Sequence, residues 1–426
     1  MRFFQKLQAG SLQFVLFVGA VIAVLLLTFV LLSYSHILFS KKADKYIEVI
    51  EKNNFIMQLA LKSNKEGQDV TALDSYQDDD IEASIDKKAW GVFESYTVST
   101  SFKKIQFQNT ALIGYGYNEQ PPALYLKDNQ RPLIIVGDAK IEGNAVLPKQ
   151  GIRPGNISGQ SYFRNRLVFG DTKLSSTVLP TINASTNETI EKLCKSLVNP
   201  NRSNIIRLSK NGTYSNSFLN ETQFIVGDKI DLTSISLTGN IMVLANREII
   251  VTSSSNLVDI VLSAPKISIK DNVQGAFQAF ASKNITVGKN CILNYPSSLA
   301  VIESARANSQ SVNQSFLPPI SIGYNSEVSG VIIYKNSNKE RLFSPQIKIH
   351  ENALFVGQLY CEKSLELKGN LIGSLFTDSF LALENGNVYQ NHLYKGTVNS
   401  YDLEEQYVGL GITGFSPDKK IVKWLY

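Results

Sequence analysis

The stretch Ile267-Ser-Ile269 sets the pattern of the body, because its pair of apolar residues two positions apart returns along the chain at an interval of eighteen residues. Alternation within the triplet is typical of a β-strand whose first and third side chains face a core. A fixed period of this length indicates a repeat architecture, in which each turn of the chain lays its strands beside those of the turn before. The pairs that follow the period, and that we predict to face the core, are Ile249 with Val251, Ile267 with Ile269, Ile285 with Val287, Ile347 with Ile349 and Leu365 with Leu367.

A second element, out of phase with the first, places a glycine between two apolar residues, as in Leu237-Thr-Gly239-Asn-Ile241. Glycine suits a corner between strands, where φ can be positive or two backbones approach closely. The predicted coil-corner glycines are Gly239, Gly275, Gly330, Gly357 and Gly373. The two elements together predict a mainly β fold, a single-stranded β-solenoid (β-helix) of about 18 residues per coil over residues 131–376, with insertions at 148–220 and 294–325.

The N-terminal region has a different character. No Asp, Glu, Lys or Arg occurs between Lys6 and Lys41, and Leu12 to Leu32 is almost wholly apolar. About twenty apolar helical residues cross the hydrocarbon layer of a bilayer. We therefore predict a cytoplasmic leader at 1–10, a transmembrane helix at 11–39 and a helical extension at 40–66. Lysines flank both sides, so the positive-inside rule does not decide the orientation, but the short leading tail favours export of the long body.

The entry to this helix carries a family resemblance. Gln8-Ala9-Gly10-Ser11-Leu12-Gln13-Phe14-Val15, after a short basic leader, resembles the start of type IV pilins and type II secretion minor pseudopilins. The resemblance implies cleavage between Gly10 and Ser11 and packing of the long helix into a filament. Val15 stands where most pilins carry glutamate, which favours a minor, tip-located subunit over a major one. An ordinary uncleaved signal anchor is the alternative.

The remaining segments complete the predicted domain organisation. A polar connector covers 67–89, a small β-module 90–130, and an aromatic C-terminal cap over the open last coil covers 377–426. Within the first insertion, a helix near Glu188 to Val198 has a capping box of Ser185 with Glu188, and we expect it to lie on a flank of the solenoid.

The composition argues against several functions. The net charge of +5 is small for 426 residues and the basic residues are scattered, so we predict no nucleic-acid partner. Three distant cysteines and three isolated histidines predict neither a metal site nor a cofactor. We predict no catalytic residues either, because Asp259 and Asp271 are not one period apart, as a pair of carboxylates on adjacent coils would be.

The pattern of the body resembles right-handed β-helices and the bactofilin-like polymer-forming repeats. We therefore predict a single-pass inner-membrane protein whose C-terminal body lies in the periplasm or at the cell surface of a bacterial envelope. We predict that it is a non-enzymatic structural or interaction protein. The more specific hypothesis within this class is a minor pilin-like component of a secretion or pilus-type machine. Protein partners are expected at the N-terminal helix and at the solenoid ends. The alternative is a polysaccharide-binding or polysaccharide-degrading β-helix protein.

Overall fold

The computed structural model describes residues 9–62, 80–117, 121–303, 317–336, 344–415 and 417–425. Most of the predicted leader, residues 67–79 of the predicted connector and residues 304–316 of the second insertion therefore lie outside the described residues. The chain divides into two compact units. The first holds Met1–Leu59, Asp69–Ser84 and Val98–Gln108, and the second holds Ala60–Gln68, Ile85–Thr97 and Asn109–Tyr426.

Helix α1 runs without interruption over Ala9–Lys62. Leu12 and Leu32, at the two ends of its apolar stretch, are 68% and 70% exposed, and the whole apolar stretch is uncovered by protein. Within the described part of the chain, this is the one helix long and apolar enough to cross a membrane. The prediction of a long apolar N-terminal helix is confirmed.

The second half of α1 is held by polar contacts within the first unit. Asn53 is fully buried, and its Nδ2 donates to the carbonyl oxygen of Val98 at 2.9 Å. Thr100 donates from Oγ1 to the carbonyl oxygen of Val49 at 3.1 Å. The polar run Lys52-Asn-Asn54, which in the sequence interrupts an apolar spacing, therefore supplies a buried amide that binds the neighbouring strand.

A four-stranded sheet has the order β1-β2-β3-β27, with β1 at Glu82–Trp90, β2 at Phe93–Phe102, β3 at Ile105–Gly116 and β27 at Asp418–Leu425. Its first strand begins inside the predicted polar connector, so that boundary is wrong. Apart from Trp90, no side chain of β1 is buried, and the strand therefore lacks the apolar alternation that would reveal it. The last strand, β27, pairs antiparallel with β3 and places Trp424 opposite Ala111.

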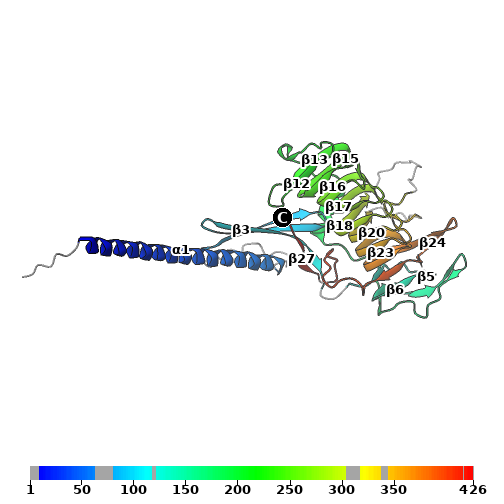
Figure 1. Cartoon of the computed structure of the whole chain (residues 1–426). Helices are drawn as coiled ribbons and strands as arrows, with labels where there is room; N and C mark the ends of the chain where they lie inside the picture. Colours follow the sequence, from blue (N-terminus) through cyan, green and yellow to red (C-terminus); the bar gives the residue numbers. More distant parts are fainter. Residues whose placement is uncertain are drawn as a thin grey trace, which may run out of the picture. The chain divides into compact units, whose positions relative to one another are not determined.

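The largest sheet is a closed barrel around one apolar core, and its pairings are parallel except that of β23 with β24 (Figure 1). A mainly β fold is therefore confirmed. Its strands are β4 (Leu124–Leu126), β6 (Lys140–Glu142), β7 (Ala145–Leu147), β11 (Thr172–Leu174), β12 (Thr213–Asn216), β13 (Gln223–Asp231), β14 (Ser236–Gly239), β15 (Ile241–Val251), β16 (Asn256–Ile269), β17 (Gln274–Val287), β18 (Ile292–Glu303), β19 (Ile320–Ile322), β20 (Glu327–Asn336), β21 (Ile347–Ile349), β22 (Leu354–Leu367), β23 (Asn370–Glu384), β24 (Asn387–Gln390) and β26 (Thr397–Asn399). A separate parallel sheet joins β25 (His392–Tyr394), β5 (Leu133–Val136) and β8 (Ile152–Pro154), and β9 (Asn156–Ile157) pairs with β10 (Gln160–Ser161).

The register of this sheet follows the sequence period. Ile267 lies opposite Ile249 on one side and Ile285 on the other. Ile347 lies opposite Leu365. All ten residues of the five apolar pairs are at most 2% exposed and belong to the same core cluster. The alternation within each triplet thus places the outer two side chains in the core.

The order of strands in space differs from the order in the chain. Strand β23 pairs with β26 and with β4, so that Leu371 lies opposite Val398 and Leu375 lies opposite Leu124. Strands β6 and β7 then continue from β26 and β4. The predicted run of coils from residue 131 onward in chain order is therefore wrong: the early strands lie beyond β23, where they satisfy the backbone groups of its free edge.

The C-terminal region covers the edge of the last predicted coil only in part. Strand β26, which lies within the predicted cap, pairs with β23, but β4 from the N-terminal side of the chain pairs with the same strand. Further along the C-terminal region, Leu410, Ile412 and Leu425 belong to a second apolar cluster on the outer face of the sheet, with Phe280 and Ile333. The aromatic tail therefore covers a flank.

Helix α2 (Ala184–Cys194) covers the same flank. Its buried residues Ile190, Leu193 and Cys194 belong to the second cluster, and the helix contacts β16, β17 and β18. The predicted helix is present, but it begins earlier than expected. Its N-cap is Asn183, whose side chain accepts from the backbone N of Ser185, and not the predicted pair of Ser185 with Glu188.

Both predicted insertions contain strands of the body. Residues 294–303 belong to β18, so the second insertion begins later than predicted. The first insertion contains β11 and β12 as well as α2. These strands have only three or four residues, too few for a period to be read from them.

Candidate binding site at one end of the parallel sheet

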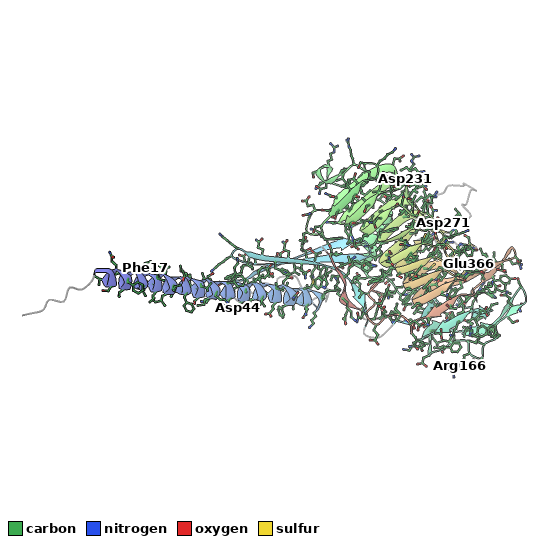
Figure 2. The ribbon with its side chains drawn as sticks, viewed as in Figure 1. Phe17, Asp44, Arg166, Asp231, Asp271 and Glu366 are labelled. Atoms are coloured by element: carbon green, nitrogen blue, oxygen red, sulfur yellow. The ribbon has the colours of Figure 1, made fainter. Side chains whose placement is uncertain are left out.

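We call the part of the body around β12 its first end and the part around β11 its last end. Strand β12 has its register with β14, and strand β11 has its register with β7. Figure 2 shows Asp231, Asp271, Glu366 and Arg166 in this order along the body, with Asp231 near the first end and Arg166 at the last. The sides between the ends carry ladders of paired charges.

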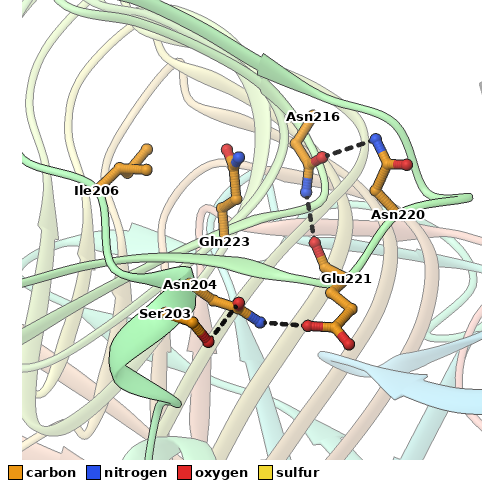
Figure 3. Close-up of a pocket in the computed structure, with 7 residues that line it drawn as sticks. All are labelled: Ser203, Asn204, Ile206, Asn216, Asn220, Glu221 and Gln223. Atoms are coloured by element: carbon orange, nitrogen blue, oxygen red, sulfur yellow. Dashed lines mark hydrogen bonds between the residues drawn. The ribbon is translucent and has the colours of Figure 1, made fainter.

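A hollow of about 250 Å³ opens at the first end, beside β12 and the start of β13 (Figure 3). Its wall comes from the short helix η2 (Arg202–Asn204), from β12 and from the turn between β12 and β13. The residues that line it are Ser203, Asn204, Ile206, Asn216, Asn220, Glu221 and Gln223. Six of the seven are polar, so the hollow suits a hydrophilic ligand.

Two asparagines of neighbouring turns, Asn216, which lines the hollow, and Asn240, hold the turn beside it. Asn216 donates from Nδ2 to the carbonyl oxygens of Glu221 at 2.8 Å and Asn240 at 2.9 Å. Asn240 donates from Nδ2 to the carbonyl oxygen of Asn220 at 2.8 Å. Each is 6% exposed. These bonds hold the turn 217–222 in place and fix the rim residues that it carries.

The rim presents hydrogen-bonding groups toward the hollow. Asn204 donates from Nδ2 to Oε2 of Glu221 at 2.8 Å, which orients that carboxylate (Figure 3). The Gln223 amide lies between Ile206 and Asn216 in this view and has no hydrogen-bond partner among the described residues. A free amide can donate to and accept from hydroxyl groups, and a carboxylate can accept from them.

No sequence motif marks this hollow. Asn216 and Asn240 are not one period apart, and the surrounding stretch is rich in Ser, Thr and Asn throughout, so no single asparagine stood out. The useful signal would have been the repeated short Asn spacing at 201, 204, 211, 216 and 220.

The predicted anchor residues lie on α1. Gly10 and Ser11 fall in its first turn, and Gly10 has open space around it. Leu12 and Leu32 are exposed. The structure thus places the predicted cleavage position at the start of the apolar helix.

The predicted corner glycines separate into two kinds. Gly330, Gly357 and Gly373 pair with one another in three successive strands and have φ of 138°, 135° and 135°. A Cβ on each would collide with the carbonyl oxygen of the residue on the preceding strand. Gly239 also has a positive φ, of 88°.

Gly275 differs from the other four. It lies opposite Leu257 and Leu293, in a column whose other members face the core. A Cβ there would lie 2.9 Å from the carbonyl oxygen of Leu257 and 3.1 Å from the Phe277 ring. Gly275 therefore leaves room both for the neighbouring strand and for a buried aromatic ring, at a position in a core-facing column that the other four do not share.

The charged groups on the sides of the body pair with one another. Glu248 receives ion-pair contacts from Lys229 and Lys266, each at 3.1 Å. Burial raises the pKa of the Glu248 carboxyl, but hydrogen bonds from Lys266, Lys229 and Ser268 outweigh it and hold this pKa at about 2. The carboxylate therefore serves as a bridge between neighbouring strands.

Asp259 and Asp271 have separate structural roles. Asp259 binds Nζ of Lys423 at 2.5 Å, and Asp271 accepts from the backbone N of Lys289 at 2.7 Å. Among the described residues, no group of three or more His, Cys, Asp or Glu side chains could hold a metal ion. The buried thiols of Cys194 and Cys361 have pKa values raised to about 12 by burial, which disfavours the reactive thiolate form.

Comparisons with protein-family models, with curated proteins and with solved structures found no match to this chain.

Proposed function

We propose that this chain is a membrane-anchored, exported and non-enzymatic structural or interaction protein of a bacterial envelope. The observation that carries the proposal is the uncovered apolar stretch of α1, whose side chains from Leu12 to Leu32 find no cover in the protein. Such a surface is stable in a bilayer or against other apolar helices, and not in water. The inner membrane as its location and the periplasm or cell surface as the site of the body belong to the same proposal.

The body is, in this proposal, a single-stranded β-solenoid. Support comes from the parallel registers at eighteen-residue offsets, as between Ile249, Ile267 and Ile285. The column of Gly330, Gly357 and Gly373 supports it too, because a solenoid repeats its corners from coil to coil. A stiff body of this kind displays its ends and loops to partners.

The narrower proposal is a minor pilin-like component of a secretion or pilus-type machine. It rests on the sequence around Gly10 and Ser11 and on the continuous helix that follows them. Mass spectrometry of the mature protein from its native cells tests it: the first residue is expected to be Ser11. Retention of Met1 would contradict pilin-like processing and would indicate an ordinary uncleaved signal anchor.

A matched pair of variants sharpens this test. Gly10→Leu is expected to abolish processing, whereas Gly19→Leu, on the same helix and equally open, leaves it intact. Cleavage of the Gly10→Leu variant would contradict a peptidase that recognises the Gly10-Ser11 junction. Equal loss of cleavage in both variants would contradict it too.

A second candidate function is polysaccharide binding at the first end of the body. The observation that favours it is the unpartnered Gln223 amide in a polar hollow that Glu221 also lines. Titration of the full chain with neutral and uronate-containing oligosaccharides tests it. Gln223→Ala is expected to weaken binding about tenfold, since one hydrogen bond contributes roughly 1 kcal/mol and the desolvated partner adds more. Binding unchanged by this variant would place the sugar elsewhere.

A further inference from the structure

The last end of the parallel body carries a concentration of positive charge. Strand β11 and the segment that leads into it from β7 hold Lys149, Arg153, Arg164, Arg166 and Lys173. The same segment, residues 149–175, has one acidic residue, Asp171. Asp128 lies nearby, and its carboxylate accepts from the backbone N of Gln130 and of Lys149. The end therefore has a net positive charge.

These five cations differ from those on the sides of the body. Along the sides, lysines pair with carboxylates, as Lys348 does with Glu366 at 3.0 Å and Lys266 with Glu248 at 3.1 Å. None of the five at the last end takes part in an ion pair within the described ranges. The charge at this end is therefore available to a partner.

Large apolar side chains are exposed beside this charge. Phe163, Leu174 and Val178 are 67%, 74% and 65% exposed. The guanidinium of Arg164 lies 5.3 Å from the centre of the Phe163 ring. Leu174 belongs to β11, whose three residues are all exposed. Apolar and cationic side chains therefore share one end of the body.

We propose that this end binds the anionic headgroups of a lipid bilayer, as a second membrane contact in addition to α1. Lysine and arginine next to an anionic bilayer gain electrostatic energy, and exposed Phe, Leu and Val gain by entering the interface. A soluble polyanion would use the cations but would leave Leu174 and Val178 in water. The pairing of both kinds of side chain thus favours a lipid surface. This contact is independent of pilin-like processing and of sugar binding in the hollow.

The test uses the full chain held by α1 in nanodiscs of phosphatidylcholine, so that the anchor is already occupied. The nanodiscs are mixed with large vesicles of phosphatidylcholine alone or with about 30 mol % phosphatidylglycerol, and co-flotation is measured as a function of salt. Binding is expected only to the vesicles that contain phosphatidylglycerol. Empty nanodiscs measure any association that does not need the protein.

Two variants of the last end and one matched control separate the contributions. Arg153→Gln with Arg164→Gln and Arg166→Gln is expected to weaken vesicle binding about a hundredfold, because each cation near an anionic surface contributes roughly a factor of five. Phe163→Ser with Leu174→Ser is expected to weaken it at least about tenfold. The control, Arg202→Gln with Arg207→Gln and Lys210→Gln, removes the same number of cations from the first end and should bind like the native chain.

Three results would overturn the proposal. The first is equal loss from the two triple variants, which would mean that binding follows total charge. The second is binding that Phe163→Ser with Leu174→Ser leaves unchanged while inorganic polyphosphate competes fully, which would indicate a soluble polyanion. The third is no association of the native chain with anionic vesicles at low salt. Circular dichroism of each variant distinguishes lost binding from lost folding.

Discussion

The hydroxyl group of Tyr407 donates to the carbonyl oxygen of Gly330 at 2.6 Å and accepts from the backbone N of Gln358 at 3.1 Å. Gly330 and Gln358 lie on neighbouring strands, β20 and β22. The Tyr407 side chain from the C-terminal segment therefore joins two turns of the body beside the column of Gly330, Gly357 and Gly373, which we call the glycine column. Burial raises the pKa of Tyr407 well above its usual value, and the hydroxyl therefore remains protonated and able to donate.

Replacement of this hydroxyl group should destabilise the body. Tyr407→Phe keeps the ring but leaves the Gly330 carbonyl and the Gln358 N–H without their partner, at an expected cost of about 2 kcal/mol in the free energy of unfolding. Urea denaturation measures it. Tyr401→Phe is the control, because Tyr401 is 65% exposed and its hydroxyl has no bond among the described contacts. Equal effects of the two variants would contradict the bridging role.

The glycine column should resist any side chain. Gly357→Ala places a Cβ against the Gly330 carbonyl oxygen at a φ of 135°, and we expect a loss of about 3 kcal/mol. Gly386→Ala also has a positive φ, of 78°, but open space around it, and should cost about 1 kcal/mol. The difference between their denaturation midpoints measures the steric part alone. A Gly357→Ala variant as stable as Gly386→Ala would show that the strands separate easily.

The joining of N-terminal and C-terminal strands should contribute to stability. Val398 is fully buried and lies opposite Leu371 on one side and Ile141 on the other. Val398→Ala is expected to cost about 2 kcal/mol, from lost burial and the cavity left behind. Val388→Ala, at a position 44% exposed, should stay within about 0.5 kcal/mol of the native chain. Native-like stability of Val398→Ala would argue against a tightly packed junction between β23, β26 and β6.

Acid should weaken the side ladder at a defined pH. The pKa of Glu248 is about 2 in the folded chain against an ordinary value of 4.5, so its contribution is complete above about pH 4.5 and is lost as the pH falls toward 2. Glu248→Gln should therefore be less stable than the native chain at pH 7, by about 1 kcal/mol, and the difference should shrink below pH 4. Glu404→Gln, at an exposed position, is the control. A difference that grows on acidification would have the wrong sign.

The parts of the fold that the sequence predicts are those that a strong local pattern specifies. The triplets around Ile267 and Leu365 repeat with one period, and the alternation in each assigns their inward faces without ambiguity. The apolar stretch from Leu12 to Leu32 is equally clear, because its length matches a bilayer.

The parts that the sequence does not predict depend on contacts between distant segments. Leu124 and Val398 belong to strands of three residues, too short to show a period, and they meet only because β23 leaves an edge to be paired. Gly275 resembles the other corner glycines in sequence, but it lies between the Leu257 carbonyl oxygen and the Phe277 ring in a core-facing column. The turn beside the hollow is held by Asn216 and Asn240 from different turns, and their spacing follows no repeat.

The central claim is that α1 anchors the body in a membrane, and alkaline carbonate extraction of membranes from the native cells tests it most directly. The full chain is expected to stay in the membrane pellet. Val24→Lys with Leu27→Lys is expected to move it to the soluble fraction, because two charges in the middle of an apolar helix make insertion unfavourable. Recovery of the native chain in the carbonate supernatant, with its N-terminal helix intact by mass spectrometry, would contradict the claim.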